Sequence, residues 1–181
     1  MFLNLSVHKN YDKDIAPYLR NGILIDTCVV KEIIDGVIAR RVSKKQSFEL
    51  EQIEQFFATL KLNNKWDKFF ITPQILTEIC KHVRSDYERG WDHKKVIDEI
   101  MPIIKAMGEQ NVSKDGFLKI IEDAGHLALE AGDISIFVAT DDFLDRKEKV
   151  AILTNDGGIN ERYEDSDRVM LMDYQAIVRN L

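Results

Sequence analysis

The chain is 181 residues long; 45% of its residues are hydrophobic and 31% are charged, and it contains three prolines and nine glycines. A chain of this length can bury a core without disulfides or a structural metal, so we expect one main domain. The composition fits a compact, helix-rich globular protein and argues against disorder or fibrous repeats. The net charge of −6 gives no general attraction for polyanions, although carboxylates that hold divalent cations would contribute to it while presenting little negative charge.

The cysteines and the N-terminal sequence indicate the compartment. Cys28 and Cys80 are too few for a disulfide scaffold and are typical of reduced thiols. The first residues do not resemble a signal peptide, and no apolar run approaches the roughly 20 residues that span a bilayer. We expect a cytoplasmic protein with no membrane association. Residues 1–22 are predicted to be an N-terminal extension, with a short strand over residues 2–7, packed on a domain of residues 23–181.

Short apolar runs bounded by turn residues predict strands that are buried on both faces. They are Ile23–Ile25, Phe69–Ile71, Val150–Leu153 and Val169–Met172. Apolar residues at helical spacing predict helices between them. These helices cover the residues after Asp26 as far as the basic run at 40–45, then 46–62, the segment that begins at Pro73 after the N-cap Thr72, 96–107, 117–129, 133–143 and the C-terminus from Tyr174.

Several details of this prediction can be checked. Phe48 and Ile97 fall on the inner faces of their helices. Residues 112–116 are predicted to be a loop. The Ala131-Gly132 pair is predicted to end the helix over 117–129 just before Asp133. Cys28 lies two positions after Asp26, a spacing that on a helix predicts a cysteine side chain pointing away from Asp26 and into the core.

Helices that alternate with short apolar strands predict an α/β protein, a three-layer α/β/α sandwich with a central parallel sheet of four or five strands. Such sheets bind ligands at the carboxyl ends of their strands. Asp26 and Asp156 lie at strand ends, Glu78 lies on the helix that leaves another strand, and Asp133 opens a helix. The topology therefore predicts one acidic pocket formed by these four residues.

Clustered carboxylates repel one another and must bind protons or cations. Oxygen ligands favour a hard cation, Mg²⁺ or Mn²⁺. A site of this kind, with one or two ions, suits hydrolysis of a phosphodiester, because a bound ion lowers the pKa of water and stabilises the leaving oxygen. The chemistry that these acids predict is that of a nuclease.

The order and context of the acids resemble those of a PIN-domain ribonuclease. The resemblance extends from about Ile23 to Met172 and rests on four short motifs: Ile25-Asp26-Thr27, Thr77-Glu78, Gly132-Asp133 and Thr154-Asn155-Asp156. It implies that the four acids bind Mg²⁺ or Mn²⁺ and catalyse endonucleolytic cleavage of RNA. Many members of the family are toxins that a small antitoxin inhibits, so the resemblance also implies an antitoxin or another protein as a partner.

The sequence departs from the family at two points. It is longer than the compact toxin members, with an N-terminal extension and helical segments around 46–62 and 91–107. The family usually places an Asp or Asn and an aromatic residue soon after the last acid, where this chain has Gly157-Gly158-Ile159-Asn160. We therefore expect Asn160 to lie next to the metal-binding acids without binding the metal itself. Thr27 and Thr154 are ordinary cap and strand-end residues that could also position a metal-bound water.

Simpler roles remain open for every one of these residues. Each acid can serve as a helix cap, turn former or solvated side chain, and a capping carboxylate still has an oxygen available for a metal. Arg40, Arg41, Lys44 and Lys45 form either a solvated helix end or a rim that contacts RNA phosphates. The alternative function is a catalytically inactive, PIN-like module that binds a protein through its long helices. A homodimer also remains open.

Overall fold

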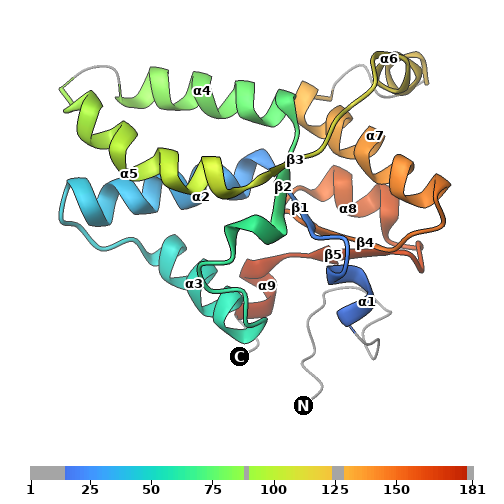
Figure 1. The fold of residues 1–181 in the computed structure, drawn as a ribbon, viewed down its shortest axis with the longest axis horizontal. Helices are drawn as coiled ribbons and strands as arrows, with labels where there is room; N and C mark the ends of the chain where they lie inside the picture. Colours follow the sequence, from blue (N-terminus) through green and yellow to red (C-terminus); the bar gives the residue numbers. More distant parts are fainter. Residues whose placement is uncertain (1–14, 88–89, 124–128, 179–181) are drawn as a thin grey trace.

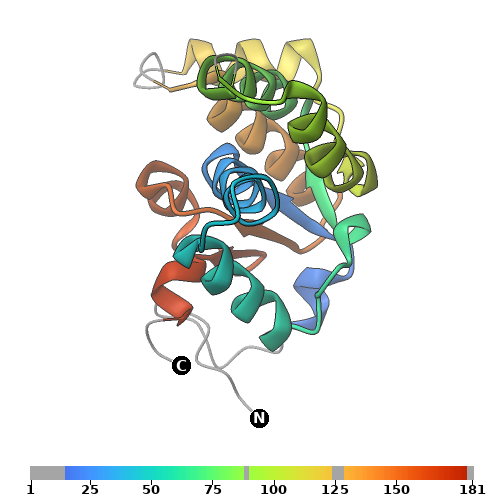
Figure 2. The ribbon, with the colours of Figure 1, turned by 90° about the vertical axis from the view of Figure 1, so that its left-hand side faces the viewer.

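The computed structural model describes residues 15–87, 90–123 and 129–178. These residues form an α/β structure on one parallel sheet of five strands, in the order β3-β2-β1-β4-β5 (Figure 1). The strands are β1 (Ile23–Ile25), β2 (Phe69–Ile71), β3 (Gly108–Glu109), β4 (Val150–Leu153) and β5 (Val169–Met172). Helices flank the sheet (Figure 2), which agrees with the predicted three-layer α/β/α sandwich.

The helices are named in chain order. They are α1 (Ala16–Leu19), α2 (Thr27–Val37) with its π-helical continuation η1 (Ile38–Val42), α3 (Phe48–Thr59), the 3₁₀ turn η2 (Trp66–Lys68), α4 (Pro73–Tyr87), α5 (His93–Ala106), α6 (Lys114–Glu122), α7 (Ala131–Asp145), α8 (Gly157–Tyr163) and α9 (Tyr174–Val178).

The central strand β1 is the most enclosed part of the sheet. Ile23 pairs in parallel register with Phe69 of β2 on one side and with Ala151 of β4 on the other. All three β1 residues are at most 1% exposed. The continuous apolar run predicts this, because a parallel strand with helices on both faces has no side exposed to water. The strand therefore delivers Asp26 to the middle of the sheet edge.

The predicted helix starts after β1 and β2 are confirmed. Asp26 is the N-cap of α2, and its side chain accepts a hydrogen bond from the Thr27 N–H. Thr72 precedes Pro73, and its hydroxyl accepts a hydrogen bond from the Ile75 N–H at 3.2 Å. Proline suits the first helical position because its nitrogen has no hydrogen to leave unpaired.

Two residues expected on inner faces are exposed instead. Phe48 is 68% exposed and Ile97 is 44% exposed. Phe48 is the first residue of α3, directly after the Ser47 cap that accepts from the Leu50 N–H. At this end of the helix its side chain is not covered by the core. Ile97 lies on the apolar stripe of α5 as predicted, but the protein covers this part of the stripe incompletely.

Three further predictions about local structure are wrong, and two elements were missed. Residues 112–116 are not all loop, because the Ser113 hydroxyl accepts from the Gly116 N–H at 3.0 Å and starts α6 at Lys114. The Ala131-Gly132 pair does not end the preceding helix but opens α7, which continues to Asp145. Strand β3 and helix α8 were not predicted. The predicted helix over 117–129 ends at Glu122, and residues 124–128 lie outside the described residues.

The described part of the N-terminal extension packs on the domain. Tyr18 is 1% exposed, and its hydroxyl donates to the Asp167 carbonyl oxygen at 2.6 Å. The Lys149 ammonium lies 4.7 Å from the centre of the Tyr18 ring. The strand predicted over residues 2–7 lies outside the described residues. None of the helices in the described ranges is long and apolar enough to cross a membrane.

Candidate functional site

Asp26 occupies the junction of β1, β4 and α2. Its backbone N–H donates to the Leu153 carbonyl of β4 at 3.0 Å, so the sheet fixes its position. Its Oδ1 accepts from the Thr27 N–H at 2.6 Å, and its Oδ2 accepts from the Thr154 hydroxyl at 2.7 Å and from the Cys28 thiol at 3.0 Å. The residue is 2% exposed. Burial raises the pKa of Asp26 above its ordinary range, although these hydrogen bonds oppose the shift.

The expectation that Cys28 points away from Asp26 is wrong. Asp26 precedes the helix and has an extended backbone, with ψ of 156°, so its side chain turns back over the first turn of α2, where Cys28 lies. Helical spacing between the two residues therefore does not apply. Burial, followed by the negative charge of Asp26, raises the pKa of the Cys28 thiol far above its ordinary value, which keeps this thiol protonated.

Thr154 connects Asp26 to Asp156. The Thr154 hydroxyl donates to Asp26 and accepts from the Asp156 N–H at 2.9 Å, and Thr154 is fully buried. Asp156 is the N-cap of α8, and its Oδ1 accepts from the Gly158 N–H at 2.7 Å and the Ile159 N–H at 3.0 Å. One hydroxyl thus fixes the ends of β1 and β4 relative to each other.

Glu78 links α4 to α2 and α7. Its Oε2 accepts from the Thr27 hydroxyl at 2.7 Å, and its Oε1 accepts from the Gly132 N–H at 2.8 Å. A Cβ atom on Gly132 would lie 2.6 Å from Glu78 Oε2 and 2.9 Å from Thr27 Oγ1. Residue 132 is therefore glycine because the carboxylate occupies the space that a side chain would need.

Asp133 follows in the first turn of α7. It forms a capping box with Glu130, in which Asp133 Oδ2 accepts from the Glu130 N–H at 3.3 Å. Burial raises the pKa of Asp133 to about 6, and the charges of Asp26 and Asp156 contribute to the shift in that order. Three of the four predicted acids therefore act on one another electrostatically, and the fourth is tied to the same helix start.

No basic side chain within the described ranges forms an ion pair with any of these four acids. Over the same ranges, no group of three or more His, Cys, Asp or Glu side chains is placed to hold a metal ion as it stands. The hydrogen bonds given above engage at least one oxygen of every acid. Binding a cation would therefore require at least one carboxylate to turn or to use a remaining lone pair.

The donor chemistry of the site fits a hard cation. The acids provide only oxygen ligands, and Asp133 Oδ1 and Asp156 Oδ2 accept no hydrogen bond from the described residues. Beside Asp156, both polar side-chain atoms of Asn155 and the Oδ1 atom of Asn160 are buried and make no hydrogen bond to the described residues. Buried polar atoms normally have a partner, so this part of the site suits a water molecule or a bound group. Mg²⁺ or Mn²⁺ with retained waters matches these donors.

The structure separates the predicted basic rim from the acids. At 1.5 Å per residue, Arg40 lies ~20 Å from Asp26 along α2 and η1. Arg40 pairs with Glu54 at 2.6 Å, and Arg41 pairs with Glu99 at 3.2 Å. Lys44 and Lys45 follow in an exposed turn. The basic run therefore lies at the opposite end of the α2–η1 helix from Asp26.

Two further residues at the sheet edge were missed by sequence reasoning. Asp173 follows β5 as Asp26 follows β1, and its Oδ1 accepts from the Ala176 N–H at 3.0 Å. Glu32 of α2 accepts a hydrogen bond from the Tyr174 hydroxyl. Burial is the largest cause of the raised pKa of Glu32, and the charges of Glu49 and Asp173 add to it. For Asp173 the signal was available: an acid directly after an apolar strand and before a helix.

The fold and site together define an α/β protein with acids gathered at the carboxyl edge of a parallel sheet. Comparisons of the chain with models of known families and with curated proteins found no match.

Proposed function

We propose that this protein is a metal-dependent endoribonuclease of the PIN-domain type, which uses Asp26, Glu78, Asp133 and Asp156 to bind one or two Mg²⁺ or Mn²⁺ ions. The observation that carries the proposal is the set of carboxylates at one sheet edge. After burial, the charge of Asp156 raises the pKa of Asp26, and the charges of Asp26 and Asp156 raise that of Asp133; no basic side chain in the described ranges pairs with them. A cation would relieve this repulsion. A bound ion would supply an activated water and charge stabilisation at the phosphodiester.

The chain's own residues would orient the site. Thr154 fixes Asp26 relative to the start of α8, and Thr27 fixes Glu78. The protonated thiol of Cys28 donates to Asp26 and does not place a second negative charge beside it. Asn160, with a buried oxygen that has no partner in the described residues, would accept from a water or substrate group beside Asp156.

The experiment compares Asp26→Asn with Asp92→Asn. Asp92 is also a capping aspartate, since its side chain accepts from the Lys95 N–H at 3.2 Å, but it caps α5 outside the acidic site. We expect Mn²⁺ to raise the Tm of the wild type and of Asp92→Asn and to leave Asp26→Asn unchanged. We also expect cleavage of a fluorescent single-stranded RNA to require metal and to be lost in Asp26→Asn alone. Equal cleavage by both variants would refute the proposal.

A second function is favoured by a specific observation. Asp26, Asp133 and Asp156 all accept hydrogen bonds at helix starts, which gives each acid a structural role without a metal. These contacts suit a catalytically inactive PIN-like module that binds a protein partner. In this case, isothermal titration would detect no binding of millimolar Mn²⁺ and the wild type would not cleave RNA.

A further inference from the structure

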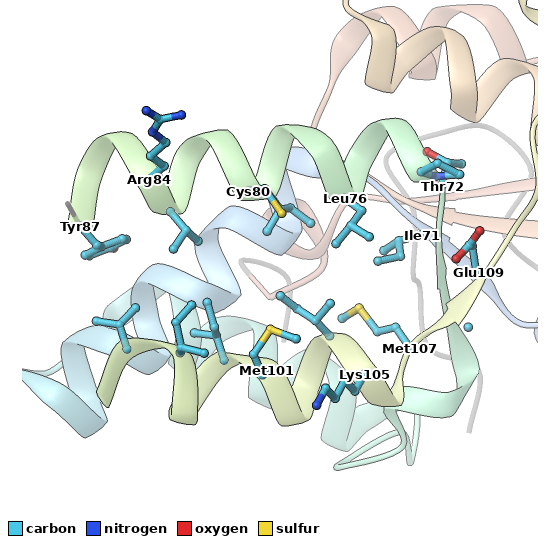
Figure 3. Close-up of a pocket in the computed structure, with 18 of the residues that line it drawn as sticks. Ile71, Thr72, Leu76, Cys80, Arg84, Tyr87, Met101, Lys105, Met107 and Glu109 are labelled. Carbon is cyan, nitrogen blue, oxygen red and sulfur yellow. The ribbon is translucent and has the colours of Figure 1, made fainter. Parts of the chain in front are cut away.

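A groove of about 830 Å³ runs between α4 and α5 (Figure 3). Glu78 does not line it. Glu78 lies two positions from both Leu76 and Cys80, which turns it by about 200° from each of them around the helix. One face of α4 therefore contacts the acidic site, and the opposite face lines this groove.

The groove has an apolar lining on both walls. Leu76, Cys80, Val83 and Tyr87 follow one another at helical spacing on α4, and Ile97, Met101 and Ile104 do so on α5. Figure 3 shows Leu76 and Cys80 extending from α4 toward α5. Ile97 is 44% exposed and Cys80 is also exposed, so the groove is open to solvent.

The shape of the groove favours a helix over two other occupants. An open channel would leave much of a small ligand in water, whereas small-molecule sites bury most of the ligand surface. A second copy of the chain, docked groove to groove through a two-fold axis, would bring two concave surfaces together. The apolar face of a helix is convex and fits between two apolar stripes. The flexible side chains of Met101 and Met107 can adapt to it.

The charge at the rim defines the partner further. Arg84 and Lys105 line the groove on different helices, and neither forms an ion pair with a described residue. Arg84 points away from the cavity in Figure 3, so a ligand enclosed between the helices would not reach it. A helix lying along the opening can extend side chains from its flanks to both edges. Glu109 also lines the groove, at the β3 end beside Met107, and forms no ion pair with a described residue. Along the two helices the unpaired lining groups Arg84 and Lys105 are cationic, so acidic side chains on the flanks of a bound helix would complement them.

We propose that the groove between α4 and α5 binds the apolar face of an amphipathic helix from another protein, one that carries Asp or Glu on both flanks. This proposal does not depend on the nuclease function, because the groove and the acids lie on opposite faces of α4. It assigns α4 and α5 a binding role whether or not the site hydrolyses RNA.

The test uses the full chain and a fluorescein-labelled synthetic peptide of about 18 residues, ~27 Å long as a helix, which has one leucine stripe flanked by glutamates. Two variants are compared by fluorescence anisotropy. Ile97→Asp places a charge in the groove, whereas Leu118→Asp places one on α6 at a side chain of matching exposure, 43% against 44%. We expect Ile97→Asp to weaken binding at least tenfold and Leu118→Asp to leave it unchanged.

Two further measurements locate the peptide and test its charge. The peptide should slow the reaction of exposed Cys80 with a maleimide, as followed by mass spectrometry of the labelled site; this readout needs no variant. The double variant Arg84→Glu, Lys105→Glu should bind the glutamate-flanked peptide less tightly and a lysine-flanked peptide more tightly than the wild type does.

Several outcomes would overturn the proposal. One is equal affinity for a scrambled peptide of the same composition, and another is equal binding by Ile97→Asp and Leu118→Asp. Self-association that Ile97→Asp disrupts, without peptide binding, would identify a second copy as the occupant instead. Binding of palmitate without binding of the peptide would identify a small apolar ligand.

Discussion

The two faces of α4 differ in how completely their side chains are satisfied by the rest of the protein. On one face, both oxygens of Glu78 accept hydrogen bonds from neighbouring elements, and a neighbouring glycine leaves room for the carboxylate. On the other face, Leu76 and Cys80 line a groove that the described protein leaves open. The polar groups at the sheet edge are held in position by hydrogen bonds, whereas side chains in the apolar groove remain exposed to solvent. The acidic site is therefore fixed by contacts within the protein, whereas the groove has apolar side chains that no described residue covers completely.

The largest effect on stability should come from the hydroxyl that joins two acids. Thr154→Val leaves the buried partners of this hydroxyl, Asp26 Oδ2 and the Asp156 N–H, without it. We expect a loss of about 2–3 kcal/mol in the free energy of unfolding, measured by urea denaturation. The matched control is Thr140→Val, because the Thr140 hydroxyl is fully buried and makes no hydrogen bond to the described residues. That change should be neutral or stabilising, and equal losses would contradict the prediction.

A smaller loss should follow from filling the space beside Glu78. Gly132→Ala places a Cβ atom 2.6 Å from Glu78 Oε2, so the carboxylate must shift. We expect the free energy of unfolding to fall by about 1–2 kcal/mol, as for other overpacked sites. Gly157→Ala is the control, since a Cβ atom there meets nothing within 4 Å. Thermal and urea unfolding of both variants would measure the difference. Similar Tm values would show that the Glu78 carboxylate can move aside at little cost.

The pH dependence of stability should report the repulsion among the acids. The pKa of Asp133 rises from its ordinary value of 3.8 to about 6, so the folded state binds its proton more tightly than the unfolded state. The stabilisation is complete below about pH 4 and is lost as pH rises through about 6. Asp133→Asn removes this dependence. Because the carboxylate is partly solvated, we expect a gain of only about 1 kcal/mol over the wild type at pH 7.

Urea titrations at pH 4 and pH 7 in EDTA would measure this gain, which should shrink toward the lower pH. Asp92→Asn, which removes a capping carboxylate outside the acidic site, is the control for the loss of a helix cap. A gain that is constant across the range would show that Asp133 does not experience the neighbouring charges.

The smallest effects should come from the distant basic run. Arg40 already pairs with Glu54, and both side chains are substantially exposed, at 37% and 52%. Arg40→Gln should therefore change the free energy of unfolding by less than about 0.5 kcal/mol. If RNA contacts this surface, Lys45→Gln should weaken binding a few-fold and reduce the slope of log K against log salt by about 1. Urea denaturation would measure the change in Arg40→Gln, and a loss above about 1 kcal/mol would contradict it. Filter binding at several salt concentrations would measure Lys45→Gln, and an unchanged slope would show that Lys45 does not contact RNA.

Sequence alone predicted the centre of the fold better than its edges. The four apolar strands and the acid after β1 follow from local signals, because buried parallel strands need continuous apolar runs and an aspartate caps the next helix. Strand β3 has only two residues, Gly108 and Glu109, and no apolar pattern. Helix α8 begins with two glycines, which also suit a turn.

The candidate site shows the same limit. The positions of the four acids follow from topology, but their hydrogen-bond partners do not. Helical spacing placed Cys28 away from Asp26 because it treats both residues as helical, whereas Asp26 is extended. Periodicity likewise placed Ile97 on an apolar stripe without showing that part of this stripe is uncovered. A pattern within one element cannot reveal which other elements reach it.

The hydrogen bond from Thr154 to Asp26 has a consequence for the order in which the molecule is made. It joins positions 128 residues apart, and β4 reaches β1 only after the intervening strands and helices have been synthesised. Contacts of such long range form late, because the chain must first close a large loop. While the ribosome is still translating the first two-thirds of the chain, Asp26 has neither Thr154 nor Asp156 beside it. Completion of the acidic site therefore coincides with near-completion of the polypeptide.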